Sequence, residues 1–311
     1  MVWIFVAISA YLLLAIANLL DKFLVDNVLK NSRAYAFVAC VLASFLLLVT
    51  PWYLSWPGTY LALFNLVIGA VFAGALWSLY EALRRGEAAR VLVFIGGATP
   101  IFSLIISLLL FQEKFSANQW WGMICLFIGL VIIAFLPIDR SYLSRLVHKF
   151  RLQFLIESGG LKIALLAAFL YSVYFIGTKY AYNTQPFASV FLWNRLGSLL
   201  FVLMFLFNKK DRQAIVNNFR RSAPKKNKYL VFIGQSFGSL GFVLQSYAIF
   251  LGSVVLVNAL QGVQYAFLLL ISTGLALISP RLLKESFSWR LFLQKTAAVI
   301  IIAAGLYFII A

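Results

Sequence analysis

The chain has 311 residues, of which 63% are hydrophobic and only 11% are charged. Because a soluble domain of average composition carries about 25% charged residues, this composition excludes a soluble globular domain. The net charge of +17 would suggest a nucleic-acid partner in a soluble protein. Here the basic residues lie between apolar segments, so we expect them to set membrane orientation and to meet anionic lipid headgroups, and we expect no nucleic-acid partner.

The apolar residues form ten blocks, each close to the ~20 residues that a helix needs to cross a bilayer. Since lipid offers backbone groups no hydrogen bonds, these blocks predict helices, and the alternating segments of a β-barrel are missing. The first block has no basic n-region and no A-x-A site, so we do not expect a cleavable signal peptide. The sequence predicts an all-α polytopic membrane protein with ten transmembrane helices, in blocks 2–21, 35–56, 60–82, 90–111, 119–137, 161–181, 187–207, 229–250, 254–278 and 291–311.

The second half of the chain repeats the first weakly but in the same order: residues 82–105 align with 248–271, and residues 34–44 align with 188–198. Loops at equivalent places differ in charge, since the uncharged loop 51–58 corresponds to the basic stretch 208–228. This difference is typical of repeats with inverted topology. We therefore predict two inverted five-helix repeats, 1–137 and 161–311, joined by a basic interfacial linker, 138–160.

Within the linker, apolar residues recur every four positions and basic residues occupy another side. We expect an interfacial helix over 140–156 that lies on an anionic leaflet; the alternative is a solvated linker. The apolar positions are Tyr142, Leu146, Phe150 and Phe154, and the basic ones are Arg145, His148, Lys149 and Arg151.

Residues 80–134 contain four short motifs: Tyr80-Glu-Ala-Leu-Arg-Arg-Gly86, Thr99-Pro100, Phe111-Gln-Glu113 and Gln119-Trp-Trp-Gly122. They resemble the ten-helix EamA-like branch of the drug/metabolite transporter superfamily, and the resemblance covers both halves. The sequence departs from the family at Gln112, where a glycine is usual, and at Gln264-Tyr265, where Pro100 predicts a proline.

The resemblance implies a secondary transporter in the cytoplasmic membrane, which moves a small organic metabolite or drug-like solute by alternating access. The chain has no G-x-x-x-x-G-K-[ST] P-loop, and we expect no enzymatic activity and no cofactor. One alternative is a flippase for a lipid-linked intermediate. Another is an integral membrane enzyme that modifies lipids. As to the oligomeric state, the sequence leaves a homodimer open.

Arg195 lies about eight residues into the seventh block, next to Asn194. An arginine at that depth needs a carboxylate, a water-filled cavity or an anionic substrate. We predict that Arg195 binds an anionic or zwitterionic group of the substrate in a cavity; the alternative is that its side chain snorkels to an interface.

The remaining candidates for substrate binding come from four other blocks. The ninth block carries a polar face, for which hydrogen bonding between helices is the alternative, and for aromatic residues near helix ends the alternative is an interfacial belt. The candidates are Asn258, Gln261, Gln264 and Tyr265 in the ninth block, Gln245 in the eighth, Tyr171 and Tyr174 in the sixth and Trp77 in the third.

Four further residues are assigned to structure. Glu81 is expected to form a surface ion pair with Arg84 and Arg85, and Lys179 is expected to snorkel. His148 is the only histidine, and we expect no metal role for it. No paired spacing of cysteines suggests a metal site or a disulfide, so Cys40 and Cys125 are expected in the core.

Of the 26 lysines and arginines, all but Lys114, Lys179 and Arg195 lie in or beside the loops after helices 1, 3, 5, 7 and 9. Basic short loops stay in the cytoplasm, so the charge predicts that both termini lie outside. The resembled family usually has both termini inside; we follow the charge because the imbalance is large and the loops are short.

Overall fold

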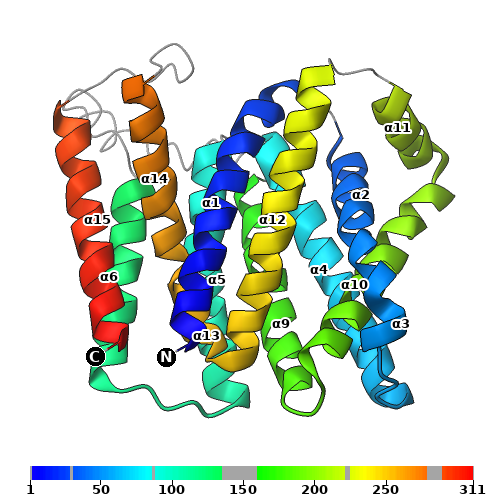
Figure 1. The fold of residues 1–311 in the computed structure, drawn as a ribbon, viewed down its shortest axis with the longest axis horizontal. Coiled ribbons are helices and arrows are strands. Elements are labelled where there is room, and N and C mark those ends of the chain that lie inside the picture. Colours follow the sequence, from blue (N-terminus) through cyan, green and yellow to red (C-terminus); the bar gives the residue numbers. More distant parts are fainter. Residues whose placement is uncertain are drawn as a thin grey trace.

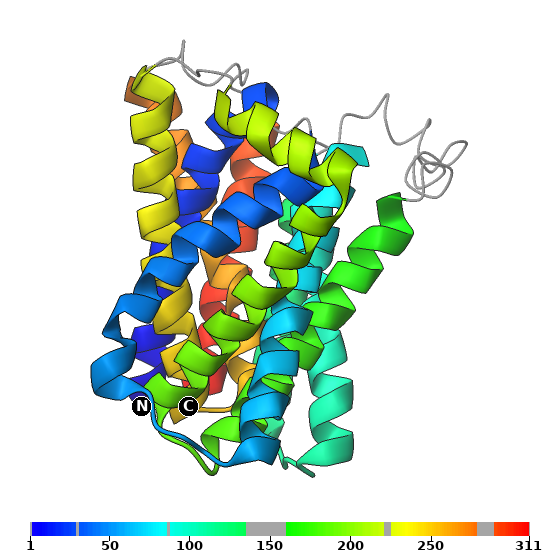
Figure 2. The ribbon, with the colours of Figure 1, turned by 90° about the vertical axis from the view of Figure 1, so that its right-hand side faces the viewer.

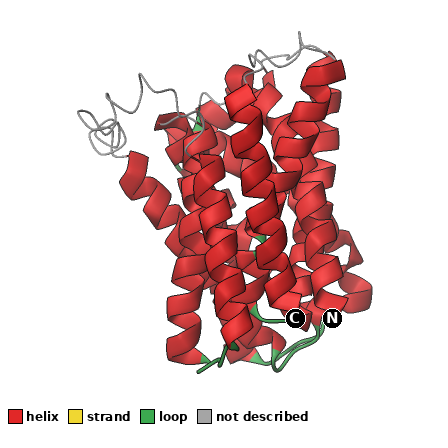
Figure 3. Cartoon of the chain, turned by 90° about the vertical axis from the view of Figure 1, so that its left-hand side faces the viewer, coloured by secondary structure: helices red, strands yellow, loops and turns green. Residues whose placement is uncertain are grey.

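The computed structural model describes residues 2–28, 31–85, 88–134, 160–220, 225–278 and 289–310. Over these residues the elements are helices, with no strand (Figure 3). The predicted all-α class is therefore confirmed. The linker 138–160 and its predicted interfacial helix lie outside the described residues, apart from Gly160.

Each predicted apolar block falls on a helix or on helices that continue one another. The first half contains α1 (Val2–Val28), α2 (Ser32–Ala43), the 3₁₀ segment η1 (Ser44–Val49), α3 (Thr50–Tyr53), α4 (Thr59–Arg85), α5 (Ala88–Leu110) and α6 (Ala117–Ala134). The second half contains α9 (Gly160–Tyr182), α10 (Phe187–Leu203), the 3₁₀ segment η2 (Met204–Phe207), α11 (Lys209–Arg220), α12 (Lys225–Leu251), α13 (Val254–Ala259), α14 (Gln261–Ile278) and α15 (Trp289–Ile310).

Among the described residues, five helical segments are long and apolar enough to cross a membrane: Val2–Leu20, Ser32–Tyr53, Thr59–Arg85, Gly160–Tyr182 and Phe187–Phe207. Shorter apolar helices cover Phe94–Leu110, Val254–Leu268 and Thr296–Ile310. The chain is thus a multi-pass membrane protein. Ten crossings and an inverted repeat stay predictions.

The helices form an upright bundle with both termini at one end and α11 at the other (Figure 1). The most extensive contacts join α1 to α12, α6 to α15, α4 to α9 and α4 to α10. Small residues allow these close approaches: a Cβ at Gly122 of α6 would lie 2.9 Å from the carbonyl oxygen of Gly305 in α15.

The backbones of α4 and α10 approach each other closely, and the two helices lie side by side in Figure 2. A Cβ added at Gly69 would overlap the carbonyl oxygen of Asn194, and one added at Gly197 would overlap the carbonyl oxygen of Leu66. The two helices therefore touch through reciprocal glycines. This contact places Asn194, the neighbour of Arg195, against the backbone of α4.

Ion pairs gather at the end of the bundle that carries α11. The Arg33 guanidinium on α2 lies 2.5 Å from the Asp211 carboxylate on α11. Glu81 pairs with Arg84 and Arg85, at 2.7 Å from each, which confirms the predicted surface ion pair. The Ser32 hydroxyl on α2 also donates a hydrogen bond to Glu81 on α4, 2.6 Å long. Polar contacts therefore join α2 to α4 through Ser32 and to α11 through Arg33.

We expect Gly69→Ala to destabilise the protein by about 1–3 kcal/mol, because the added methyl must push two backbones apart. Gly74→Ala on the same helix is the matched control, since a Cβ there meets only the Leu170 side chain at 3.8 Å. Melting temperatures of the two purified variants measure the difference. Equal melting temperatures would show that the α4–α10 contact tolerates a side chain.

The charge-based orientation predicts that α11 faces the cytoplasm. A single cysteine at position 218, in a background that lacks Cys40 and Cys125, should resist an impermeant thiol reagent in intact cells and react after the membrane is opened. Labelling in intact cells would reverse the orientation. A control cysteine at position 114, which the charge assigns to the opposite side, should react in intact cells.

Candidate functional site

The guanidinium of Arg195 lies inside the helix bundle, with the side chain only 5% exposed. Its Cζ atom lies over three aromatic rings, at 4.6 Å from the centroid of Phe242, 4.8 Å from Phe191 and 5.1 Å from Phe72. These rings come from α12, α10 and α4, so three helices meet at one cation. We call Arg195 with these rings the arginine cage.

Within the described residues, no carboxylate pairs with Arg195 and its guanidinium donates no hydrogen bond. A cation over a desolvated aromatic face gains about 2 kcal/mol, which offsets part of the cost of burying the charge. The five N–H donors of the guanidinium are suited to paired hydrogen bonds with a carboxylate or phosphate. The arginine cage therefore presents a positive charge whose donors are not used by the described protein groups.

Polar atoms without partners surround the arginine cage. Asn194 donates its amide to the Thr178 hydroxyl at 3.0 Å, but its Oδ1 has no hydrogen-bond partner among the described groups, and neither has the Ser246 hydroxyl or the Tyr182 hydroxyl. The Tyr174 phenol lies near Asn194 and Ser246. Tyr174 and Tyr182 are also within electrostatic range of Arg195. Donors and acceptors thus lie together beside one buried cation.

Tyr171 and Tyr174 on α9 form an aromatic wall with two rings of the arginine cage. The ring of Tyr174 lies 4.9 Å from Phe72 and 6.0 Å from Phe242, and Tyr171 lies 6.2 Å from Phe72. The predicted residues Arg195, Asn194, Tyr171 and Tyr174 are therefore brought together.

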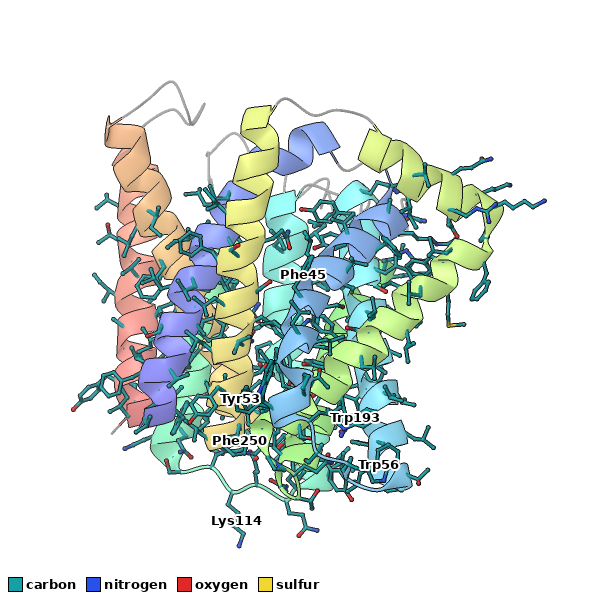
Figure 4. All side chains as sticks on the ribbon, turned by 45° about the vertical axis from the view of Figure 1, so that its right-hand side comes forward. Phe45, Tyr53, Trp56, Lys114, Trp193 and Phe250 are labelled. Atoms are coloured by element: carbon teal, nitrogen blue, oxygen red, sulfur yellow. The ribbon has the colours of Figure 1, made fainter. Side chains whose placement is uncertain are left out.

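At the end that carries the termini, the loop between α3 and α4 covers α10. The Ser55 carbonyl accepts hydrogen bonds from the Trp193 indole and the Ser189 hydroxyl, both 3.1 Å long. Trp56 packs edge-on against Trp193 at 5.6 Å, and both lie near the lower end in Figure 4. Deeper in the bundle, the Asn65 amide donates to Gln185 at 2.8 Å. These contacts hold the α3–α4 loop against α10 at that end.

The candidates on α13, α14 and α12 make different contacts. The Asn258 amide donates to the Ser103 hydroxyl on α5 at 3.0 Å, and Tyr265 donates to the Leu92 carbonyl at 2.7 Å. The Gln245 amide donates to the Tyr11 hydroxyl at 3.4 Å. These three residues join helices to one another, which was the alternative for this polar face. Gln264 is buried and Gln261 is half-buried.

Trp77 lies on another part of α4. The Cζ atom of Arg33 lies 4.8 Å from the centroid of the Trp77 ring. The centroid of the same ring lies 5.6 Å from that of Phe205. Because Arg33 pairs with Asp211 of α11, Trp77 belongs to the ion-paired end of the bundle rather than to the arginine cage.

The three phenylalanines of the cage were not predicted from the sequence. Phe191 precedes Arg195 by four residues on one helix, so helical spacing could have found it. Phe72 and Phe242 come from distant segments, and 30 phenylalanines in the chain offered no way to select them.

A separate cavity of about 200 Å³ lies between α5, α6, α13 and α14, and its lining includes Gly96, Pro100, Trp120, Ala259 and Gly262. None of the predicted substrate-binding residues lines it. Over the described residues, no group of three histidine, cysteine or acidic side chains could hold a metal ion.

Comparisons with known proteins bear on the family. Residues 1–135 match the EamA-like transporter family. The Uncharacterized transporter YdfC of Bacillus subtilis (strain 168) is 29% identical over 142 residues, which are 45% of this chain and 40% of that relative. The matched part is thus less than half of that relative's length. A solved crystal structure of a protein aligns with 98% of this chain and 95% of its own chain, with a TM-score of 0.62 and 15% identity, which shows a shared fold. The match of residues 1–135 to the EamA-like transporter family agrees with the predicted resemblance to the drug/metabolite transporter superfamily.

Proposed function

We propose that this protein is a secondary transporter of the cytoplasmic membrane, which moves a small organic solute by alternating access. The observation that carries the proposal is the arginine cage, a buried cation that no described carboxylate neutralises. Breaking or omitting a partner of a buried charge is strongly unfavourable. If the site binds and releases an anionic solute, the bound solute pairs with Arg195 and offsets the free-energy cost of burying its charge.

The packing of the helices supports an inverted repeat. Under the predicted alignment of the two halves, α1 corresponds to α9 and α4 corresponds to α12. The contact between α1 and α12 then corresponds to the contact between α9 and α4, and both are among the most extensive in the bundle. Transporters built from inverted repeats place their substrate near the midplane, between the repeats. The arginine cage joins α4 of the first half to α10 and α12 of the second.

We infer that the substrate carries an anionic or zwitterionic group. Arg195 binds the anionic part, and the unpaired Oδ1 of Asn194 accepts a hydrogen bond from a neutral or cationic donor. Tyr171 and Tyr174 pack against an apolar portion or hold a cationic one through their ring faces. Asn258, Tyr265 and Gln245 hold neighbouring helices together, and Trp77 lies at the ion-paired end. Of the predicted binding residues, we therefore place Arg195, Asn194, Tyr171 and Tyr174 at the site.

Arg195→Ala should lower solute uptake into proteoliposomes about ten- to a hundredfold, because a charge-assisted hydrogen bond contributes about 1.5–3 kcal/mol. Arg195→Lys should restore only part of the uptake, since an ammonium lacks the planar fork of donors. Purified, monodisperse protein should be obtained in both cases. Arg212→Ala is the control, because this arginine is exposed on α11.

Normal uptake by Arg195→Ala would remove Arg195 from the site. Loss of folded protein in both Arg195 variants would make the residue a structural cation, and the site would then be sought on α12, α13 and α14.

A flippase for a lipid-linked intermediate is the second candidate. The observation that favours it is the lateral cavity between α5, α6, α13 and α14, whose rim residues Ile101, Ile124 and Phe127 are more than 40% exposed. Such a cavity could admit a hydrocarbon chain while Arg195 binds a phosphate. Proteoliposomes separate the two functions: the transporter takes up labelled anionic solutes, whereas the flippase redistributes labelled phospholipid between leaflets without net uptake.

A further inference from the structure

Lys179 lies near the end of α9 and is half-buried. Its ammonium nitrogen donates hydrogen bonds to three backbone carbonyls: Ile249 at 3.0 Å, Phe250 at 3.1 Å and Gly252 at 2.7 Å. An ammonium has three N–H donors, so each has a partner. The three carbonyls belong to the last turn of α12 and the link to α13, and we call them the carbonyl cradle.

The cradle forms at the end of α12, where Phe250 and Gly252 are half-buried. The last carbonyls of a helix have no partner in the helix and carry the negative end of its dipole. At Gly252 the chain lies so close to Trp3 that a Cβ would be 2.8 Å from that ring. Phe250 packs against the rings of Tyr182 at 5.4 Å and Phe187 at 5.8 Å, and Figure 4 shows Phe250 at the lower end of the bundle. A cation thus takes the place that water holds at an exposed helix end.

A carboxylate adds negative charge to this region. Glu113, in the loop between α5 and α6, accepts a hydrogen bond from the Ser253 hydroxyl at 2.8 Å. It interacts electrostatically with Lys179, although no ion pair between the two is formed. One carboxylate and three carbonyl oxygens therefore face one ammonium, and removing the ammonium would leave a negative, oxygen-lined space.

We propose that the carbonyl cradle is a binding site for a large monovalent cation, and that the side chain of Lys179 is its resident cation. The three oxygens lie 2.7–3.1 Å from the nitrogen, a range that suits an ammonium donor. A calcium ion binds oxygen at about 2.3–2.6 Å and a magnesium ion at about 2.0–2.1 Å, so the cradle is too wide for either. The resident cation links α9 to the α12–α13 junction, and Ser253 of that junction bonds Glu113 of the α5–α6 loop.

Lys179→Ala empties the cradle and tests the proposal. The melting temperature of the purified variant should fall by about 5 °C or more, because three charge-assisted hydrogen bonds are lost. Titration with methylammonium or potassium chloride should restore at least half of the loss. N-methyl-D-glucamine chloride at equal ionic strength should not, since that cation is too large to enter.

Three controls separate a specific site from a general salt effect. The unchanged protein should not respond to methylammonium, because Lys179 occupies the cradle. Lys179→Met should not respond either, because the methionine side chain, longer than that of alanine, fills the space without charge. Glu113→Gln added to Lys179→Ala should weaken the response severalfold. If Lys179→Ala is unstable on purification, its size-exclusion profile in crude detergent extracts with and without methylammonium replaces the melting curve. Equal effects of all the salts, or equal responses of Lys179→Ala and Lys179→Met, would overturn the proposal.

Discussion

Burying the charge of Arg195 constrains the arrangement of the surrounding helices. A guanidinium inside a bilayer is costly unless other groups interact with it, and here the interacting groups are the rings of Phe72, Phe191 and Phe242. Phe191 lies on α10 itself, Phe72 comes from the closely packed α4, and the ring of Phe242 reaches Arg195 from α12. The glycines at 69 and 197 permit this approach on the α4 side. The glycines of the α4–α10 contact and the burial of Arg195 therefore depend on each other.

The two cations Arg195 and Lys179 are accommodated in opposite ways. Lys179 has a carbonyl partner for every N–H, so its binding capacity is used within the protein. Arg195 has its faces covered by rings, but no described residue accepts a hydrogen bond from it. A cation with all its donors used stabilises one arrangement of the chain. A cation with free donors can respond to a solute, and this difference separates the structural residue from the candidate binding residue.

The apolar blocks predicted the helices because the length and hydrophobicity of a segment are properties of the sequence alone. The direction that each helix faces could not be predicted in the same way, since lipid-facing and inward-facing surfaces are both apolar. On α9, Leu165 and Phe169 are exposed, whereas Ala164 and Ala168 are buried, so side-chain size marks the interior better than polarity does. The polar face with Asn258 was found by its helical spacing, but that spacing could not tell a contact with Ser103 from a substrate contact. The cage rings on α4 and α12, and the carbonyls that hold Lys179, depend on tertiary packing and left no signal in the sequence.

The contact between α4 and α10 also limits how this part of the protein can move. Where Gly69 and Gly197 meet the opposite backbone, no side chain lies between the helices, so a change of rotamer cannot absorb a small displacement. The helices can either remain in register or separate as rigid bodies. Packed interfaces favour discrete arrangements over continuous deformation, and an intermediate separation here would leave an unfilled gap. If transport opens this contact, its opening is therefore expected to be abrupt, with few partly open conformations between the two positions.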